Sequence, residues 1–525
     1  MTMGERMYSL RARNNLSQEK FAESIGVSRQ AVQKWENDSS MPDVDNLQTI
    51  ARKYAVSLDW LVSGRSGRDK EILQSMSLTP DYTAIPWFLD YSSDSQLEYR
   101  QCCEEGRPVQ QYEPLFDAVS KLPAGAVREK MADALFELVM QTPVAPERAE
   151  AEPSALPEIH EQAAGFDALS LVRPDAATLA DKIRGAWMGR ICGCLLGKPV
   201  EGMRTPAIHT LLKGTGNWPL SRYMRADEIS EELAAAAQIS VAGHAFADCV
   251  DCAPVDDDTN YTVLAGELIE RYGYDFEPKH VADLWMTLQP FSAYFTAERV
   301  AFRNFMAGYR PPVSAAYKNP YREWIGAQIR GDYFGYIHPC DPQAAADMAW
   351  RDASISHIKN GIYGEMWVAA MLACAAGCDD LLRILECGLS VIPQRSRLHE
   401  AVSGIIDGYR NGVSQEKAFA DIHRRYDEFD GHHWCHTISN AMIVAASLLY
   451  GEGDYGRSIC MAVQTGFDTD CNAATVGSIL GMRGGCAAIG PEWQAPVKGK
   501  LRVAICERNI YTVDELVERT LRHIR

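Results

Sequence analysis

Two short segments of this chain carry clustered carboxylates. In one, PVDDDTNY, Asp256, Asp257 and Asp258 open a stretch with helical spacing. In the other, GFDTDCNAATVG, Asp468 and Asp470 follow a glycine-containing turn. Oxygen ligands at such short spacing suit magnesium, which favours octahedral coordination by oxygen. We therefore predict that the two segments meet and bind a pair of magnesium ions, which can orient a diol and activate water.

Helix capping is an alternative explanation for either segment alone. Asp and Thr are frequent at helix N-termini, where their oxygens accept free N–H groups and a carboxylate interacts favourably with the helix dipole. Two such segments, each followed by a helix rich in small residues, favour a metal site over two unrelated caps.

Three further segments carry groups that could hold a sugar, a base or a phosphate: IRGDYFGYIHP at 329–339, ASISHIKNGIYGE at 353–365 and GHHWCHTISN at 431–440. Aromatic rings can stack on a base, whereas histidine and asparagine can hydrogen bond to ribose or phosphate. Zinc binding by the histidines is a less favoured alternative, because no carboxylate partner is obvious nearby. The residues that we expect to bind substrate are Asp332, Tyr333, His357, Asn360, His436 and Gly466.

The segments that must position these residues are helical by their pattern. From about residue 175 to 525, long alanine-rich apolar stretches such as GEMWVAAMLACAAG and SNAMIVAASLLYG alternate with loops rich in Gly, Pro and Asp. The alternation typical of strands is nearly absent, so the expected fold class is all-α. Residues 67–140 are expected to form a small helical region of unknown role. Residues 141–174, rich in Pro, Ala and Glu, read as an acidic, extended linker.

Residues 1–66 read as five short helices with Ser17 and Ser28 as N-caps and Gly26 in the turn between two of them. Across residues 5–62 the order SQEKFAESIGVSRQAVQKWENDSSMPD resembles the Cro/repressor-type helix-turn-helix family. The resemblance implies that the helix opening at Ser28 enters the major groove of double-stranded DNA. The residues expected to contact DNA are Gln18, Ser28, Arg29, Gln30, Gln33 and Lys34.

Charge limits the partners of the chain. The net charge is −18, yet residues 1–66 are nearly neutral. The acidic bulk argues against wide, nonspecific nucleic-acid binding, although it does not exclude a small DNA reader at one end. The alternative for residues 1–66 is a module used only for protein contacts or dimerisation, and a homodimer is left open.

Without an apolar run near 18 residues or a signal-peptide pattern, we expect a cytoplasmic protein that makes no membrane contact.

Residues 175–525 resemble the ADP-ribosylglycohydrolase family through three motifs. They are RGAWMGRICGCLLGKPVEGM at 184–203, DDDT at 256–259 and GFDTDCNAATVGSILG at 466–481. The resemblance implies an all-helical fold, two central magnesium ions and hydrolysis that releases ADP-ribose from a modified target. Asp256 stands where many members have Thr, and Cys471 stands where many have Thr or Ser. A thiol is a poor magnesium ligand, which implies a different or weaker second ion.

The expected catalytic residues are Glu201, Asp257 and Asp470, with Glu201 gating or positioning the attacking water. The alternative for Glu201 is a solvated loop carboxylate without a catalytic role.

For the whole chain, the alternative is a transcription regulator whose C-terminal domain senses ADP-ribose or a related nucleotide without turnover.

Overall fold

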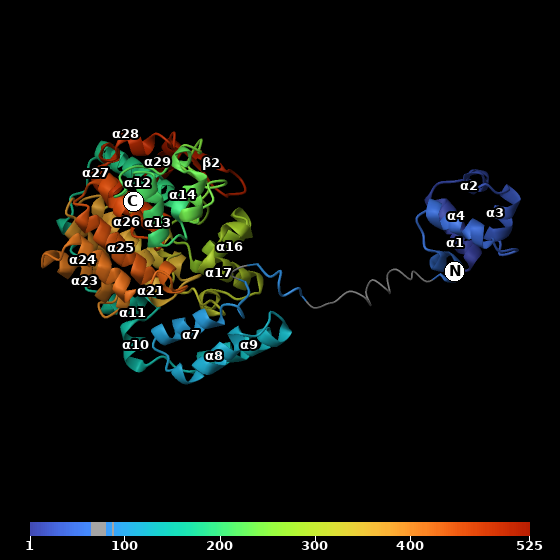
Figure 1. The fold of residues 1–525 in the computed structure, drawn as a ribbon, viewed down its shortest axis with the longest axis horizontal. Helices are drawn as coiled ribbons and strands as arrows, with labels where there is room; N and C mark the ends of the chain where they lie inside the picture. The colour runs from blue at the N-terminus through green and yellow to red at the C-terminus, as the bar shows by residue number, and fades with distance from the viewer. Residues whose placement is uncertain (65–79, 87–88) are drawn as a thin grey trace. The chain divides into compact units, whose positions relative to one another are not determined.

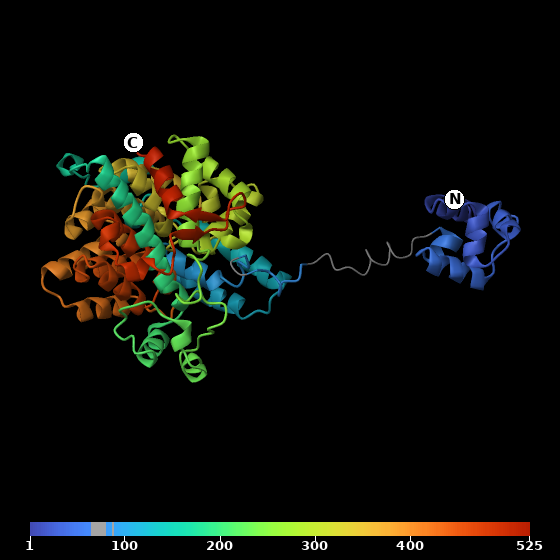
Figure 2. The ribbon, with the colours of Figure 1, turned by 90° about the horizontal axis from the view of Figure 1, so that it is seen from above.

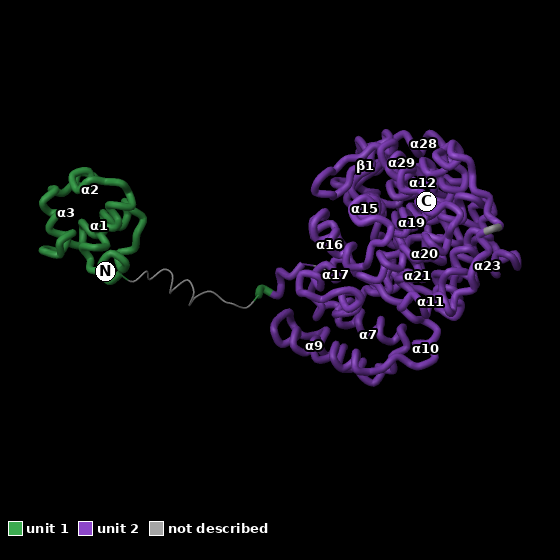
Figure 3. The backbone as a smooth tube through the Cα atoms, turned by 180° about the vertical axis from the view of Figure 1, so that it is seen from behind, with its two compact units in different colours: residues 1–81 green, residues 82–525 purple. Residues whose placement is uncertain are grey.

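The structure is a computed structural model that describes residues 1–64, 80–86 and 89–525. It divides into two compact units, Met1–Asp81 and Tyr82–Arg525, which Figure 3 draws in separate colours. Residues 67–79, which belong to the region of unknown role predicted from the sequence, lie outside the described residues.

The smaller unit contains the five predicted helices, labelled in part in Figure 1: α1 (Met3–Arg13), α2 (Gln18–Ile25), α3 (Arg29–Glu36), α4 (Val44–Lys53) and α5 (Leu58–Ser63). The side chain of Ser17 accepts a hydrogen bond from the backbone of Lys20, and that of Ser28 accepts one from Ala31. Both predicted N-caps are therefore confirmed. Phe21, Val32 and Ile50 are fully buried in a core that belongs to this unit alone.

The larger unit begins with five helices that precede the main body: α7 (Ser95–Glu104), α8 (Glu113–Ser120), α9 (Ala126–Gln141), α10 (Pro146–Ala151) and α11 (Leu156–Gln162). Its main body contains α12 (Ala176–Gly197), α13 (Thr205–Gly214), α14 (Glu231–Ala236), α15 (Asp257–Tyr272), α16 (Pro278–Leu288), α17 (Thr296–Met306), α18 (Val313–Ala316), α19 (Asp332–Ile337), α20 (Pro342–Ala353), α21 (Lys359–Ala375), α22 (Leu381–Ser390), α23 (Arg397–Arg410), α24 (Gln415–Arg425), α25 (Thr437–Tyr450), α26 (Tyr455–Gln464), α27 (Thr469–Gly484), α28 (Pro491–Gln494) and α29 (Val513–Arg522). In the described residues the only sheet is the antiparallel pair β1 (Lys500–Arg502) and β2 (Ile510–Thr512), so the all-α prediction is confirmed.

The centre of the larger unit consists of helices that are buried on every side. All residues of α21 and α25 are buried, as are residues 469–482 of α27. These are the alanine- and glycine-rich segments singled out in the sequence. A helix that is apolar or small all round has no face for water and therefore lies in the core.

A glycine seam joins α12 to α27. Gly185, Gly189, Gly193 and Gly197 recur every four residues and so lie on one face of α12. A Cβ atom at any of them would overlap backbone atoms of α27, in the order Gly481, Gly477, Ala473 and Asp470. Because the partners follow one another in reverse order along α27, the two helices run antiparallel with their backbones in contact. This packing brings the C-terminal end of α12 to the N-terminal end of α27.

Residues 141–174 are not the extended linker that their composition predicts. They contain α10 and α11, and the side chains of Ile159 and Glu152 are buried. Glu152 accepts hydrogen bonds from the backbone and guanidinium of Arg397 on α23. Proline stands at the first helical turn in both α10 and α11, where it is tolerated, so the composition that suggested a linker is compatible with two short helices.

Figures 1 and 2 show the blue and cyan helices α7–α9 lying against the rest of the larger unit.

None of the described helices is both long enough and apolar enough to cross a bilayer.

We expect Gly189→Ala to destabilise the larger unit by about 1–3 kcal/mol, because the added methyl group meets the backbone of Gly477, which cannot move aside cheaply. Gly404→Ala is the matched control: this glycine also lies within a helix, α23, but faces open space. There the change should stabilise by about 0.5–1 kcal/mol through helix propensity. Thermal unfolding of the full chain measures both. A Gly189→Ala protein as stable as the Gly404→Ala protein would refute the glycine seam.

Candidate active site

The two predicted acidic segments meet at the end of the glycine seam. Asp257 begins α15, Asp256 caps it, and Asp468 precedes α27. A carboxylate oxygen of Asp258, one of Asp470 and the sulfur of Cys471 all lie within 4.8 Å of one another. Asp256, Asp258, Asp468 and Asp470 are buried, whereas Asp257 is partly exposed. We call these five aspartates the carboxylate cluster.

The fully buried Arg190 of α12 supports the cluster from behind. Its guanidinium contacts Asp258 at 3.1 Å and Asp332 at 3.0 Å, and it also donates to the carbonyl oxygens of Asp258 and Ile329. Asp332 is therefore a structural partner of Arg190, although the sequence suggested a substrate contact. Arg190 was missed by sequence reasoning. The available signal was a lone charged residue within the apolar, glycine-rich stretch WMGRICG.

The cluster concentrates negative charge in a buried place. Burial raises the pKa values of Asp257, Asp258 and Asp470 well above their usual range, with further contributions from neighbouring carboxylates. Burial likewise raises the pKa of Asp468, and Glu201 adds to the shift. Bringing five carboxylates together is unfavourable unless positive charge compensates them.

Part of that compensation comes from Lys198, which directly follows α12. Its ammonium nitrogen lies 2.7 Å from Asp256 Oδ2, 2.7 Å from Glu201 Oε2 and 3.5 Å from Asp470 Oδ2. Glu201 ends the short 3₁₀ turn Lys198–Val200, and its side chain is 41% exposed. Glu201 therefore lies at the solvent edge of the carboxylate cluster.

Three other carboxylate oxygens of the cluster are suited to bind a divalent cation. Asp258 Oδ2, Asp468 Oδ1 and Asp470 Oδ1 are buried and have no hydrogen-bond donor among the described residues. Buried carboxylate oxygens without a donor are costly, and a hard cation is the partner that such oxygens prefer. Cys435 and Asn440 hold the second segment in place, because Cys435 Sγ donates to Asp468 Oδ2 at 3.4 Å and Asn440 Oδ1 accepts the backbone N–H of Asp468.

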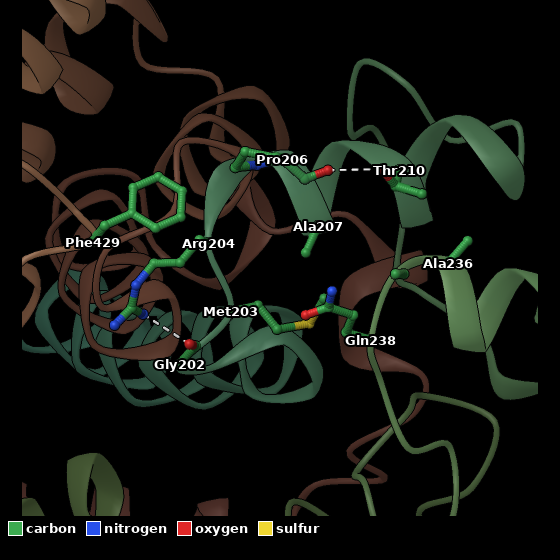
Figure 4. A pocket seen from close by; sticks show the side chains of 10 residues that line it. Gly202, Met203, Arg204, Pro206, Ala207, Thr210, Ala236, Gln238 and Phe429 are labelled. Carbon is green, nitrogen blue, oxygen red and sulfur yellow. Dashed lines mark hydrogen bonds between the residues drawn. The ribbon is translucent and has the colours of Figure 1, made fainter.

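A pocket of about 430 Å³ opens where the chain leaves Glu201. Figure 4 shows its lining, in which the exposed ring of Phe429 lies beside Arg204 on one side and Gln238 lies opposite. The guanidinium of Arg204 also lies 5.1 Å from the ring centroid of Trp434. This volume is in the range of small-molecule sites. None of the predicted substrate-binding residues lines it.

Most of those predicted residues lie in the protein interior. Tyr333 is fully buried, packs on Trp187, and its hydroxyl is hydrogen bonded to His523. Asn360 is fully buried, with its amide bound to Glu323 and to the backbone of Leu398. His357 is also fully buried, 3.9 Å from Glu298. These three positions favour structural roles.

Gly466 lies close to both the pocket and the cluster. It adopts a φ of 75°, which favours glycine, in the turn immediately before Asp468. A Cβ atom there would collide with Glu428 and Thr205, and Thr205 directly precedes the pocket residue Pro206. Among the predicted substrate-binding residues, Gly466 is the one that borders the pocket region.

His436 belongs to a turn whose three histidines surround one carboxylate, Glu104 of α7. The ring nitrogens His432 Nε2, His433 Nε2 and His436 Nε2 lie 3.5, 3.3 and 3.6 Å from its oxygens. In each ring Nδ1 accepts an N–H, from Trp324, Asp427 and Ile438 respectively. A ring nitrogen that accepts an N–H carries no proton, so the proton of each ring belongs on Nε2, the nitrogen that faces Glu104. His433 Nε2 is hydrogen bonded to Glu104, whereas the Nε2 atoms of His432 and His436 lie in longer contacts with it. This tautomer opposes zinc binding.

Electrostatics agree with that assignment. Burial acts to raise the pKa of Glu104, but the histidines lower it well below its usual value. Burial lowers the pKa of His436 to about 3, so its ring is neutral. The same turn contains Cys435, which contacts Asp468. Glu104 thus holds a turn that borders the carboxylate cluster.

The rest of α7 is anchored by buried ion pairs. Arg322 pairs with Glu98 at 2.8 Å and with Glu105, and all three side chains are buried. Gln101 donates to Glu323 at 2.6 Å. Glu98 and Gln101 of α7 and Glu105, its C-cap, recur every three or four positions, so one face of α7 packs against the main body through polar contacts. The part of the region without a role that contains α7, α8 and α9 thus belongs to the body that contains the cluster.

In the smaller unit, four of the six predicted DNA-contacting residues are exposed on one helix. Arg29, Gln30, Gln33 and Lys34 are exposed on α3, as a base-reading helix requires. Ser28 Oγ caps α3. Gln18 is only partly exposed and donates to Glu36, which also pairs with Arg11, so its amide is engaged inside the unit.

We expect Glu104→Ala to destabilise the larger unit by about 1–3 kcal/mol, because it removes the hydrogen bond to His433 and the only carboxylate that the contacting atoms of His432, His436 and Arg397 share. Thermal unfolding of the full chain measures the change. The exposed Glu137 of α9 provides the control, Glu137→Ala, which should unfold like the wild type. Equal stability of all three proteins would show that Glu104 does not anchor this turn.

Comparison with known proteins separates the two units. Residues 7–61 match the helix-turn-helix family model. Over 64 residues the chain is 39% identical to the HTH-type transcriptional activator BcrR of Enterococcus faecalis, covering 12% of this chain and 31% of that protein. Over 95 residues it is 31% identical to the uncharacterized HTH-type transcriptional regulator YobD of Bacillus subtilis (strain 168), covering 16% of this chain and 85% of that protein.

The larger unit has its own match. A solved structure titled as an ADP-ribosylglycohydrolase-related protein complex aligns with 66% of this chain and 98% of its own, with a TM-score of 0.40 and 19% identity. The ADP-ribosylglycohydrolase family model matches residues 175–523, which include α12, the carboxylate cluster and the glycine seam. The chain thus belongs to the ADP-ribosylglycohydrolase family and carries a helix-turn-helix domain at its N-terminus.

Proposed function

We propose that the larger unit hydrolyses an ADP-ribosyl glycosidic bond and releases ADP-ribose from a modified protein or another target. The observation that carries this proposal is the meeting of Asp258 and Asp470, whose carboxylate oxygens lie within 4.8 Å of each other, beside the solvent-exposed Glu201. Both of these aspartates, and the nearby Asp468, have an unpartnered buried oxygen. Magnesium is the cation that we propose for these oxygens. When bound there, it would supply positive charge to polarise water and ribose hydroxyl groups.

The chain's own residues then have distinct tasks. Glycosidic cleavage at ribose passes through an oxocarbenium-like state, in which positive charge develops at the anomeric carbon. Glu201 lies at the edge of the carboxylate cluster, so it can accept a proton from water, or hold that water, on the side open to solvent. Lys198 keeps Glu201 oriented toward the cluster through their 2.7 Å contact.

The pocket next to Glu201 is the place that we propose for the rest of the ADP-ribosyl group. Phe429 offers an exposed ring, and Arg204 offers a guanidinium whose charge suits an anionic phosphate. Gly202 and Met203 line the same pocket and directly follow Glu201, so a ligand bound there would place one end beside the carboxylate cluster.

We further propose that the smaller unit binds double-stranded DNA and so brings the hydrolase to a particular site. The exposed residues of α3 support this proposal, as do the two HTH-type regulators that residues of this unit resemble.

Asp470→Asn is expected to leave the fold intact and to reduce ADP-ribose release by at least roughly a hundredfold, because it removes one charge from the group that would align the cation. Glu201→Gln should retain ligand binding and slow turnover. The assay is release of ADP-ribose from ADP-ribosylated arginine, serine and nucleic acid at saturating magnesium, alongside thermal unfolding. Asp275→Asn, at an exposed aspartate after α15, is the control.

A wild-type protein that releases nothing from any of these substrates but binds free ADP-ribose tightly would contradict hydrolysis. It would favour a regulator that senses ADP-ribose.

For DNA, Arg29→Ala and Gln33→Ala should each weaken binding to a sequence selected from a random library by about 1–3 kcal/mol, because both remove base contacts. ADP-ribose release should not change, since the smaller unit has its own core. Arg52→Ala on α4 is the control, because Arg52 is exposed outside the α2–α3 pair. Binding that falls equally for selected and unrelated DNA would argue against base reading.

A further inference from the structure

The carboxylate cluster contains a positive charge that belongs to the chain itself. The ammonium group of Lys198 is surrounded by oxygens of Asp256, Asp470 and Glu201, at 2.7, 3.5 and 2.7 Å. Its side chain is 25% exposed, so the ammonium is largely enclosed by these carboxylates. Asp256 and Asp470 come from the two segments that the sequence predicted to hold a pair of ions.

The backbone fixes Lys198 in this place. Gly197, the last residue of the glycine seam, packs directly on the backbone of Thr469 and Asp470. Lys198, the next residue, therefore lies beside the N-terminal end of α27, and its side chain reaches the cluster. A lysine side chain is an ammonium at neutral pH, and three carboxylate oxygens surround this one.

Six oxygens, five from four aspartates of the cluster and one from Glu201, fall into two sets. Asp256 Oδ2, Glu201 Oε2 and Asp470 Oδ2 face the ammonium. Asp258 Oδ2, Asp468 Oδ1 and Asp470 Oδ1 have no donor among the described side chains. Asp470 belongs to both sets, with one oxygen for each. The cluster thus has two positions for positive charge, and Lys198 satisfies one of them.

We propose that Lys198 takes the place of one of the two cations and that this chain binds a single divalent cation at Asp258 and Asp470, with the nearby Asp468 as a further ligand. This inference rests on the proposed function only in that both use the same carboxylates. The fixed ammonium supplies positive charge at the side of Glu201 without a second ion. The sequence prediction of two magnesium ions counted the aspartates without the lysine that lies among them.

Counting bound Mn²⁺ tests the inference, because Mn²⁺ accepts the same oxygen ligands as magnesium and is visible by electron paramagnetic resonance. We expect the wild-type full chain to bind one Mn²⁺ in equilibrium dialysis, with the spectrum of an isolated ion. Lys198→Ala removes the ammonium and opens its position, so this variant should bind two Mn²⁺ with spin coupling between them, as in two-metal sites about 3.5–4 Å apart.

Lys182→Ala is the matched control. Lys182 lies on the same helix, α12, but its ammonium bonds to the carbonyl oxygens of Ala375 and Arg483, and this variant should still bind one Mn²⁺. Two ions or none in the wild type would overturn the inference, as would one ion in a folded Lys198→Ala protein. If Lys198→Ala does not fold, Lys198→Ser carries the same expectation, and the wild-type count decides independently.

The count needs no substrate, so the two proposals fail separately. One Mn²⁺ per chain with no ADP-ribose release would retain the inference and reject hydrolysis. Two Mn²⁺ with release would do the reverse.

Discussion

The close antiparallel contact between α12 and α27 is the constraint on which the site depends. Four glycines at four-residue spacing leave no side chain between the helices, so each backbone touches the other. Such contact fixes the position of one helix along the other more tightly than a seam of flexible side chains would. The end of α12 and the beginning of α27 are therefore placed together. This packing therefore brings Lys198, Glu201 and Asp470 close together.

A second constraint acts on the segment that carries Asp468. The histidine turn 432–436 is held between Glu104 of α7 and the Cys435 contact with Asp468. Buried charges are costly alone, and here arginines and carboxylates satisfy one another across the boundary between α7 and the main body. The body that contains the site therefore begins well before residue 175, where the match to the ADP-ribosylglycohydrolase family begins.

Much of the fold could be predicted from local patterns. Serine caps, the alanine-rich helices and the spacing of apolar residues are local signals, and the five N-terminal helices and the helical main body follow from them. The meeting of Asp258 and Asp470 was predictable because both segments carry the same oxygen chemistry.

What the sequence hid was the pairing of residues distant along the chain. Arg190 and Lys198 look like isolated charges in an apolar motif, and only the fold brings carboxylates around them. Tyr333 and Asn360 looked suited to a ligand because their types are versatile. The same versatility lets them satisfy buried partners such as His523 and Glu323. The composition of residues 141–174 wrongly predicted an extended linker, because short helices anchored by ion pairs contain similar residue types.

We propose that two segments distant along the chain form one cation site because the glycine seam brings them together. Anomalous diffraction from crystals of the full chain grown with Mn²⁺ tests it most directly. We predict a Mn²⁺ peak at coordination distance from Asp258, Asp468 and Asp470, with the Lys198 ammonium still beside Asp256. A Mn²⁺ peak bound only elsewhere, or the two acidic segments lying apart, would contradict it.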